Sequence, residues 1–123
     1  MTALQCPARV FVARPGGAPG LAEALRAERI ARVWCGPLPA AVATAEAAAA
    51  LLGVGVVVRG GLRGLRVEGR LPAVLEEIAD EHPGEAVLVV GDVCTLPGTG
   101  AGCLELEVDA DGWRVVRRGA ADD

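Results

Sequence analysis

The fold is decided by a short apolar run, Ala86-Val87-Leu88-Val89-Val90, which follows the turn residues His82-Pro83-Gly84 and leads into Gly91-Asp92-Val93. A run of apolar residues between turn signals is typical of a strand that is buried on both faces. Just before it, the segment 71–82 carries apolar residues at spacings of three and four, which predicts a helix there. A helix that leads into a buried strand is the building block of a parallel sheet.

The same alternation of helix and strand extends toward the N-terminus. Short runs rich in β-branched residues predict strands over 9–13, 32–35 and 54–58. Apolar spacing of three and four predicts helices over 20–30 and 37–52. Toward the C-terminus, a segment of period two over 103–108, the turn signal Asp109-Ala110-Asp111-Gly112 and a return strand over 113–117 predict a hairpin.

These elements predict one α/β domain over residues 1–123, because the length leaves no room for a second domain. We expect three layers, in which a mostly parallel sheet is covered by helices on both faces. The C-terminal hairpin should add antiparallel strands at one edge of the sheet.

The composition excludes several kinds of chemistry. The chain has no Lys, Ser, Asn or Tyr, and its single histidine is His82. A serine nucleophile, a Schiff-base lysine and a Walker A phosphate loop are therefore impossible. The four cysteines form no Cys-x-x-Cys pair, so we predict neither a metal site nor a cofactor.

The same composition limits partners and location. A formal net charge of −4 and only three aromatic residues argue against nucleic acid. Every apolar run is far shorter than the roughly 20 residues of a membrane span. Without an export signal, reduced thiols in the cytoplasm are expected. Heavy use of Ala, Gly, Arg and Val suggests a GC-rich bacterial genome. The remaining partner classes are a small-molecule ligand or another protein.

Three fragments at the ends of predicted strands carry a family resemblance: Arg14-Pro15-Gly16, Cys35-Gly36-Pro37-Leu38-Pro39-Ala40-Ala41 and Gly91-Asp92-Val93. Together with Thr44-Ala45, His82-Pro83-Gly84 and the closing hairpin, their order resembles the histidine phosphatase superfamily, the phosphoglycerate-mutase-like enzymes. In that family the three fragments read Arg-His-Gly, Ser-Pro-Leu-x-Arg-Ala and Ser-His-Gly. The resemblance spans most of the chain and implies a truncated form of the family's α/β fold.

The departures from the family pattern fall on its chemistry. The resemblance places the nucleophilic His at Pro15, the second His at Asp92, the second pocket Arg at Ala40 and an acidic proton donor near Gly64. Of the family's functional residues, only the first arginine is retained, as Arg14. The resemblance therefore implies a degenerate member that lacks both catalytic histidines, since proline cannot form a phosphohistidine.

A vestigial pocket is expected at the positions that match the family's site: Arg14, Pro15, Gly16, Cys35, Ala40, Asp92 and Cys94. We expect Arg14 and Asp92 to form an ion pair, because opposite charges about 4 Å apart attract by on the order of 4 kcal/mol at an effective dielectric constant near 20. That pair is either a remnant of a ligand site or a structural pair that keeps the old pocket satisfied. Cys35 and Cys94, at carboxyl ends of strands, are either reactive thiols or buried apolar residues.

Two other features have an ordinary interpretation beside a functional one. Arg63 lies in an arginine- and glycine-rich loop, 59–70, and with Arg14 it is a candidate anion ligand, although charged loops usually face water. His82 is interpreted as a side chain at a helix C-terminus and not as a base.

Two classes of function follow. The first is a catalytically inactive relative of the phosphatases that acts as a binding, regulatory or accessory protein. The alternative is a repurposed enzyme of a bacterial biosynthetic pathway that uses Asp92 with Arg14 or Cys94. Phosphatase or mutase activity by the family mechanism is not expected in either case.

Overall fold

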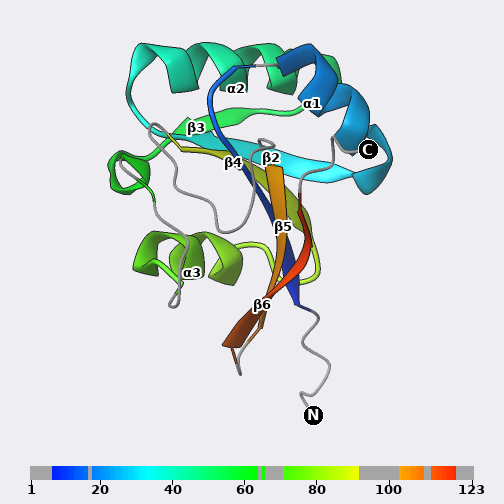
Figure 1. Cartoon of the computed structure of the whole chain (residues 1–123), viewed down its shortest axis with the longest axis vertical. Coiled ribbons are helices and arrows are strands. Elements are labelled where there is room, and N and C mark those ends of the chain that lie inside the picture. Colours follow the sequence, from blue (N-terminus) through cyan, green and yellow to red (C-terminus); the bar gives the residue numbers. More distant parts are fainter. Residues whose placement is uncertain are drawn as a thin grey trace.

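A computed structural model describes residues 7–16, 18–63, 65, 71–91, 103–109 and 112–118, which contain a six-stranded sheet (Figure 1). The strands are β1 (Ala8–Ala13), β2 (Ile30–Cys35), β3 (Val56–Val58), β4 (Ala86–Val90), β5 (Cys103–Asp109) and β6 (Gly112–Arg118). Their order across the sheet is β3-β2-β4-β1-β5-β6. The first four strands are parallel, and β5 and β6 form an antiparallel hairpin at one edge. The predicted α/β fold is confirmed.

Helices cover both faces of this sheet (Figure 1). On one face lie α1 (Ala18–Leu25), continued by the short 3₁₀ helix η2 (Arg26–Glu28), and α2 (Pro39–Leu52). On the other face lies α3 (Ala73–Asp80), which the 3₁₀ helix η3 (Gly60–Leu62) precedes in the chain. The three predicted layers are therefore present. No helix in the described part of the chain is long and apolar enough to span a membrane.

The central strand β4 joins the two halves of the core because both of its faces are buried. Val87 and Val89 pack toward α3, whereas Leu88 and Val90 pack toward α1 and α2. All four side chains are fully buried. This explains the uninterrupted apolar run of the sequence, since a strand between two helix layers has no side that faces water.

The alanine content of α2 determines how closely this helix approaches the sheet. Its inward positions, Ala41, Ala45 and Ala48, are fully buried against the sheet. Such small side chains leave room for the larger residues of the strands. Pro39 stands in the first turn, where its missing N–H costs no hydrogen bond, and Gly53 ends the helix in a left-handed conformation with φ +75°.

Three predicted boundaries or environments differ from the structure. A strand was expected over 54–58, but β3 is only three residues long, and it is half-buried because it lies at an edge of the sheet. The helix expected over 20–30 starts earlier and ends at Leu25, with Arg29 in a left-handed conformation after η2. The helix expected over 71–82 is shorter, because Pro72 favours an extended backbone before its first turn.

Candidate functional site

Hydrogen bonds extend the sheet by one residue beyond the carboxyl ends of its parallel strands. The Gly91 N–H donates to the Ala13 carbonyl over 3.1 Å, and the Gly36 N–H donates to the Val90 carbonyl over 3.1 Å. The Arg59 N–H donates to the Cys35 carbonyl over 2.8 Å. The residues after the strands therefore stand in one row, in the order Arg59, Gly36, Gly91 and Arg14. Parallel α/β sheets bind ligands at this carboxyl edge, which makes it the candidate site.

The turn after β1 is held closed by the first turns of α2. The Gly16 N–H donates to Oγ1 of Thr44 over 2.7 Å, and the Thr44 hydroxyl donates to the Ala40 carbonyl over 2.9 Å. Gly16 has a φ of +105°, which side chains other than hydrogen rarely allow. Thr44 is only 6% exposed, and its hydroxyl both accepts and donates a hydrogen bond within the protein.

The other residues of this corner provide little catalytic chemistry. Arg14 and Pro15 are half-buried after β1. Ala40 is exposed in the first turn of α2 and offers a methyl group where the resemblance places a second arginine. Among Arg14, Pro15 and Ala40, only Arg14 is charged, and none of the three side chains can act as a nucleophile.

Cys35 lies at the carboxyl edge, as predicted, but it faces the core. It is the last residue of β2, it is fully buried, and it packs among the apolar residues between the sheet and α2. Thiol reactivity requires a solvent-accessible thiolate, so the structure favours the interpretation of Cys35 as a buried apolar residue.

Arg59 is directed toward α3 and away from the row of strand ends. Its guanidinium group forms ion pairs with Glu77 of α3 and with Glu81, the residue after α3, and lies 5.7 Å from the ring centroid of Trp34. Three strand spacings of about 4.8 Å also separate β3 from β1, so the backbones of Arg59 and Arg14 are roughly 14 Å apart. The two arginines thus do not converge on one anion.

Several predicted residues are not tested by the structure. Asp92 and Cys94 lie outside the described residues, so the expected ion pair of Arg14 with Asp92 stays a prediction. Arg63 is described, and it is exposed at the end of η3, as expected of a charged loop residue. Among the described residues, no group of His, Cys, Asp and Glu could hold a metal ion.

The sequence interpretation missed two contributors to this region. Thr44 is the only hydroxyl in α2, a signal that could have identified it as a ligand for the neighbouring turn. His82 follows the C-terminus of α3, as expected, and its N–H donates to the Ala79 carbonyl over 3.0 Å, but its side chain is buried, 7% exposed, against Trp34. A lone histidine gave no sequence signal for that contact, because its partner is 48 residues away.

Comparisons with known proteins agree with this architecture. No protein-family model matches the sequence, and no curated protein is significantly similar to it. Phosphoglycerate mutase from Plasmodium falciparum shares the fold with a TM-score of 0.65 at 13% sequence identity, over 93% of this chain and 91% of its own. A protein described as a phosphohistidine phosphatase, SixA, from Agrobacterium tumefaciens has a TM-score of 0.60 at 14% identity, over 89% of this chain and 95% of its own. The fold that the resemblance implied is confirmed: this chain has a phosphoglycerate-mutase-like fold.

Proposed function

We propose that this chain is a catalytically inactive domain of phosphoglycerate-mutase-like fold that acts as a binding, regulatory or accessory protein. The observation that carries the proposal is the turn after β1. Pro15 stands where the resemblance places the nucleophile, and the neighbouring Gly16 N–H already donates to Thr44.

Phosphoryl transfer through position 15 lacks its first requirement. The nitrogen of Pro15 is part of a peptide bond, so it has no lone pair that can accept a phosphoryl group and no proton to move. A covalent intermediate at this position is therefore impossible without a substitution.

The second requirement, donors that converge on the transferring group, is also unmet in the described residues. The Gly16 N–H donates to Thr44, Ala40 is uncharged, and Arg59 is paired with the carboxylates of Glu77 and Glu81. Loss of a single oxyanion donor typically costs roughly 100- to 1000-fold in rate. The loss of several donors together with the nucleophile supports an inactive domain.

The test is a steady-state assay of the purified chain with a chromogenic phosphate ester and with phosphoglycerates. We expect no turnover above background, and none from the Pro15→His variant, which regains an imidazole but no second arginine. Turnover that survives the Asp92→Ala substitution would overturn the proposal. Turnover that disappears in Asp92→Ala or Cys94→Ala would instead establish the alternative, a repurposed enzyme.

Binding of inorganic phosphate gives an independent measurement. A site with a dissociation constant one hundred times below the phosphate concentration would stabilise the fold by about 2.7 kcal/mol, roughly 10 °C in melting temperature. We expect no such shift from millimolar phosphate, with sodium chloride at matched ionic strength as the control. A saturable rise in melting temperature that Arg14→Gln abolishes would instead show that the turn after β1 binds phosphate without turning over its esters.

A further inference from the structure

Trp34, His82 and Glu85 form a chain of hydrogen bonds on the α3 side of the sheet. The indole Nε1–H of Trp34 donates to Nε2 of His82 over 3.3 Å, and Nδ1 of His82 lies 2.8 Å from Oε1 of Glu85. The two rings meet edge to face, with centroids 5.9 Å apart and planes at 83°. Trp34 and His82 are both buried, and neither has a part in the proposed function.

The local sequence fixes this arrangement. In the turn His82-Pro83-Gly84-Glu85, the Glu85 N–H donates to the His82 carbonyl over 3.0 Å, and Gly84 has a φ of +75°. Proline followed by a left-handed glycine is the pattern of a type II turn, which brings its first and last residues together. The carboxylate of Glu85 is thereby held beside the imidazole ring.

The hydrogen-bond partners determine which nitrogen of His82 carries the proton. An indole N–H only donates, so Nε2 of His82 must accept with its lone pair. The single proton of the neutral ring is then on Nδ1, where it donates to the carboxylate of Glu85. Both ring nitrogens are satisfied in this neutral tautomer.

We propose that the hydrogen bond between Trp34 and His82 links β2 to the end of α3 and breaks when the ring of His82 takes up a second proton. We call this hydrogen bond the latch. That proton comes from water and bonds to the lone pair of Nε2, which gives an imidazolium. The Nε2–H and the indole Nε1–H of Trp34 are then two donors that face each other, and their hydrogen bond is lost. The carboxylate of Glu85 keeps its bond to Nδ1 and balances the new charge.

Loss of the hydrogen bond between Trp34 and His82 affects the carboxyl edge of the sheet through Arg59. The guanidinium group of Arg59 lies over the same indole ring, where ion pairs with Glu77 of α3 and with the following Glu81 hold it. Movement of Trp34 and a second cation beside its ring both weaken the cation–π contact. Because the Arg59 N–H donates to the carbonyl of Cys35, the loosening extends to the last residue of β2.

The test is an NMR titration of the ¹⁵N-labelled chain over the range of about pH 8 to pH 5, in which an ordinary histidine changes its charge. His82 is the only histidine, and the Trp113→Phe variant assigns the indole resonance of Trp34. We expect that resonance to move in one single-proton step and the ring of His82 to be the Nδ1–H tautomer at the upper end. The protection of the Arg59 amide against hydrogen exchange should fall several-fold over the same step. The amide of Val33, which donates to the Gly55 carbonyl and whose side chain packs on the face of the sheet opposite Trp34, is the control and should not change.

The His82→Gln variant keeps an acceptor for the indole but cannot titrate, so the step should vanish. Should that variant fail to fold, Glu85→Gln serves instead, and the midpoint of its step should move to lower pH because a carboxylate that favours the imidazolium is gone. An indole resonance that stays constant from pH 8 to pH 5, or a step that persists in His82→Gln, overturns the proposal. A pH-dependent step in the indole resonance of Trp34 without a loss of hydrogen-exchange protection at the Arg59 amide also overturns the proposal, because the hydrogen bond would then have no effect on the end of β2.

Discussion

At the scale of single residues, the contact that most constrains the candidate site is the one between Gly16 and Thr44. Replacement of Thr44 by valine keeps the shape but removes the acceptor for the Gly16 N–H and the donor to the Ala40 carbonyl. We expect Thr44→Val to lower the free energy of unfolding by about 0.5–1.5 kcal/mol, because a part-buried hydrogen bond is lost. Thr44→Ser, which retains the hydroxyl, should lose less, and equal losses in urea-induced unfolding would contradict the assignment.

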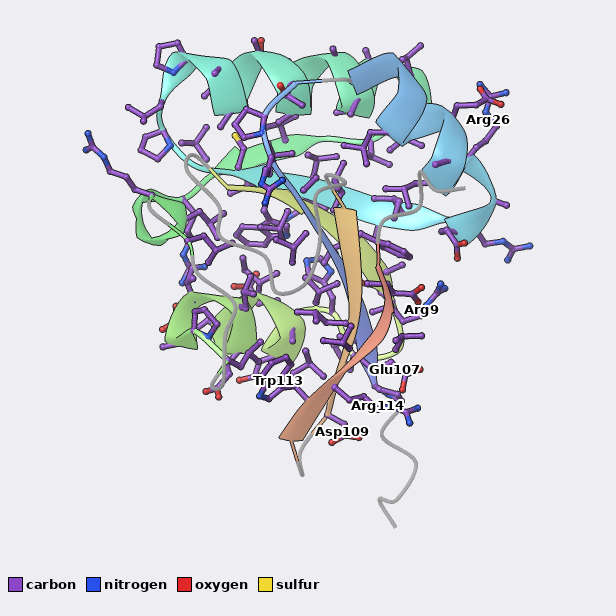
Figure 2. All side chains as sticks on the ribbon, viewed as in Figure 1. Arg9, Arg26, Glu107, Asp109, Trp113 and Arg114 are labelled. Carbon is purple, nitrogen blue, oxygen red and sulfur yellow. The ribbon has the colours of Figure 1, made fainter. Side chains whose placement is uncertain are left out.

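A second residue-scale prediction concerns two ion pairs of the same strand, β5. Glu105 is buried and bonds to Arg9 over 3.0 Å, whereas Glu107 bonds to the exposed Arg114 (Figure 2). Glu105→Gln should lower the free energy of unfolding by about 1–3 kcal/mol, since it leaves a partly buried charge with one partner fewer. Glu107→Gln should cost less than about 1 kcal/mol. Chemical denaturation of the two variants would contradict this view if their order were reversed.

The pH dependence of the first pair follows from the guanidinium group. The pKa of Arg9 is raised, chiefly by its hydrogen bond to Glu28 and further by Glu105, against an opposing effect of burial. A pKa that is higher in the folded than in the unfolded state adds stability that is lost only as the pH rises through the folded value. The contribution of Arg9 should therefore be constant between about pH 6 and pH 9, where arginine stays protonated. We expect the free energy of unfolding of Glu105→Gln to differ from that of the wild type by the same amount across that range.

At the scale of the element, two glycines of the α1–α2 layer should respond in opposite directions. Gly20 lies within α1 with open space around its Cα, so Gly20→Ala should stabilise the protein by roughly 0.5–1 kcal/mol. Gly53 ends α2 with a positive φ, and its N–H donates to the Ala49 carbonyl over 2.7 Å. Gly53→Ala should therefore destabilise the protein by about 1 kcal/mol. Thermal melts of both variants give the comparison, and two shifts of the same sign would be inconsistent with it.

The elements themselves were predictable from the sequence, but their environments were not. The apolar run of β4 encodes its burial and the period-two segment identifies β5, so both strands were found at the correct positions, although the buried Glu105 departs from the alternation of β5. The half-burial of β3 depends on its place at the sheet edge, which follows from the order of strands and not from local periodicity.

The same distinction applies to the candidate site. The position of Cys35 at the carboxyl edge follows from the strand pattern, and so does the turn at Gly16. The engagement of Arg59 with α3 and of His82 with Trp34 depends on residues far apart in the chain, and side-chain pairing across that distance leaves no periodic signal.

At the scale of the whole molecule, the two sheet edges differ in how they resist association. The edge strand β3 is only three residues long, and the edge strand β6 carries Arg114 and an irregular register opposite Glu105 and Leu106. Short edge strands, charged side chains and bulges all discourage pairing with a second chain. The sheet therefore ends on both sides in features that keep it from being extended.

For the whole molecule, we expect a phosphoglycerate-mutase-like fold that carries out no phosphoryl transfer at the turn after β1. The most direct measurement is intact-mass analysis of the chain after incubation with a chromogenic phosphate ester, followed by rapid denaturation and performed on wild type and Pro15→His. We expect an unmodified chain in both proteins, because the wild type has no nucleophile at position 15 and the variant still carries Ala40 where the resemblance places the second arginine. A single phosphoryl group added to the wild-type chain, and released as the ester is turned over, would contradict it.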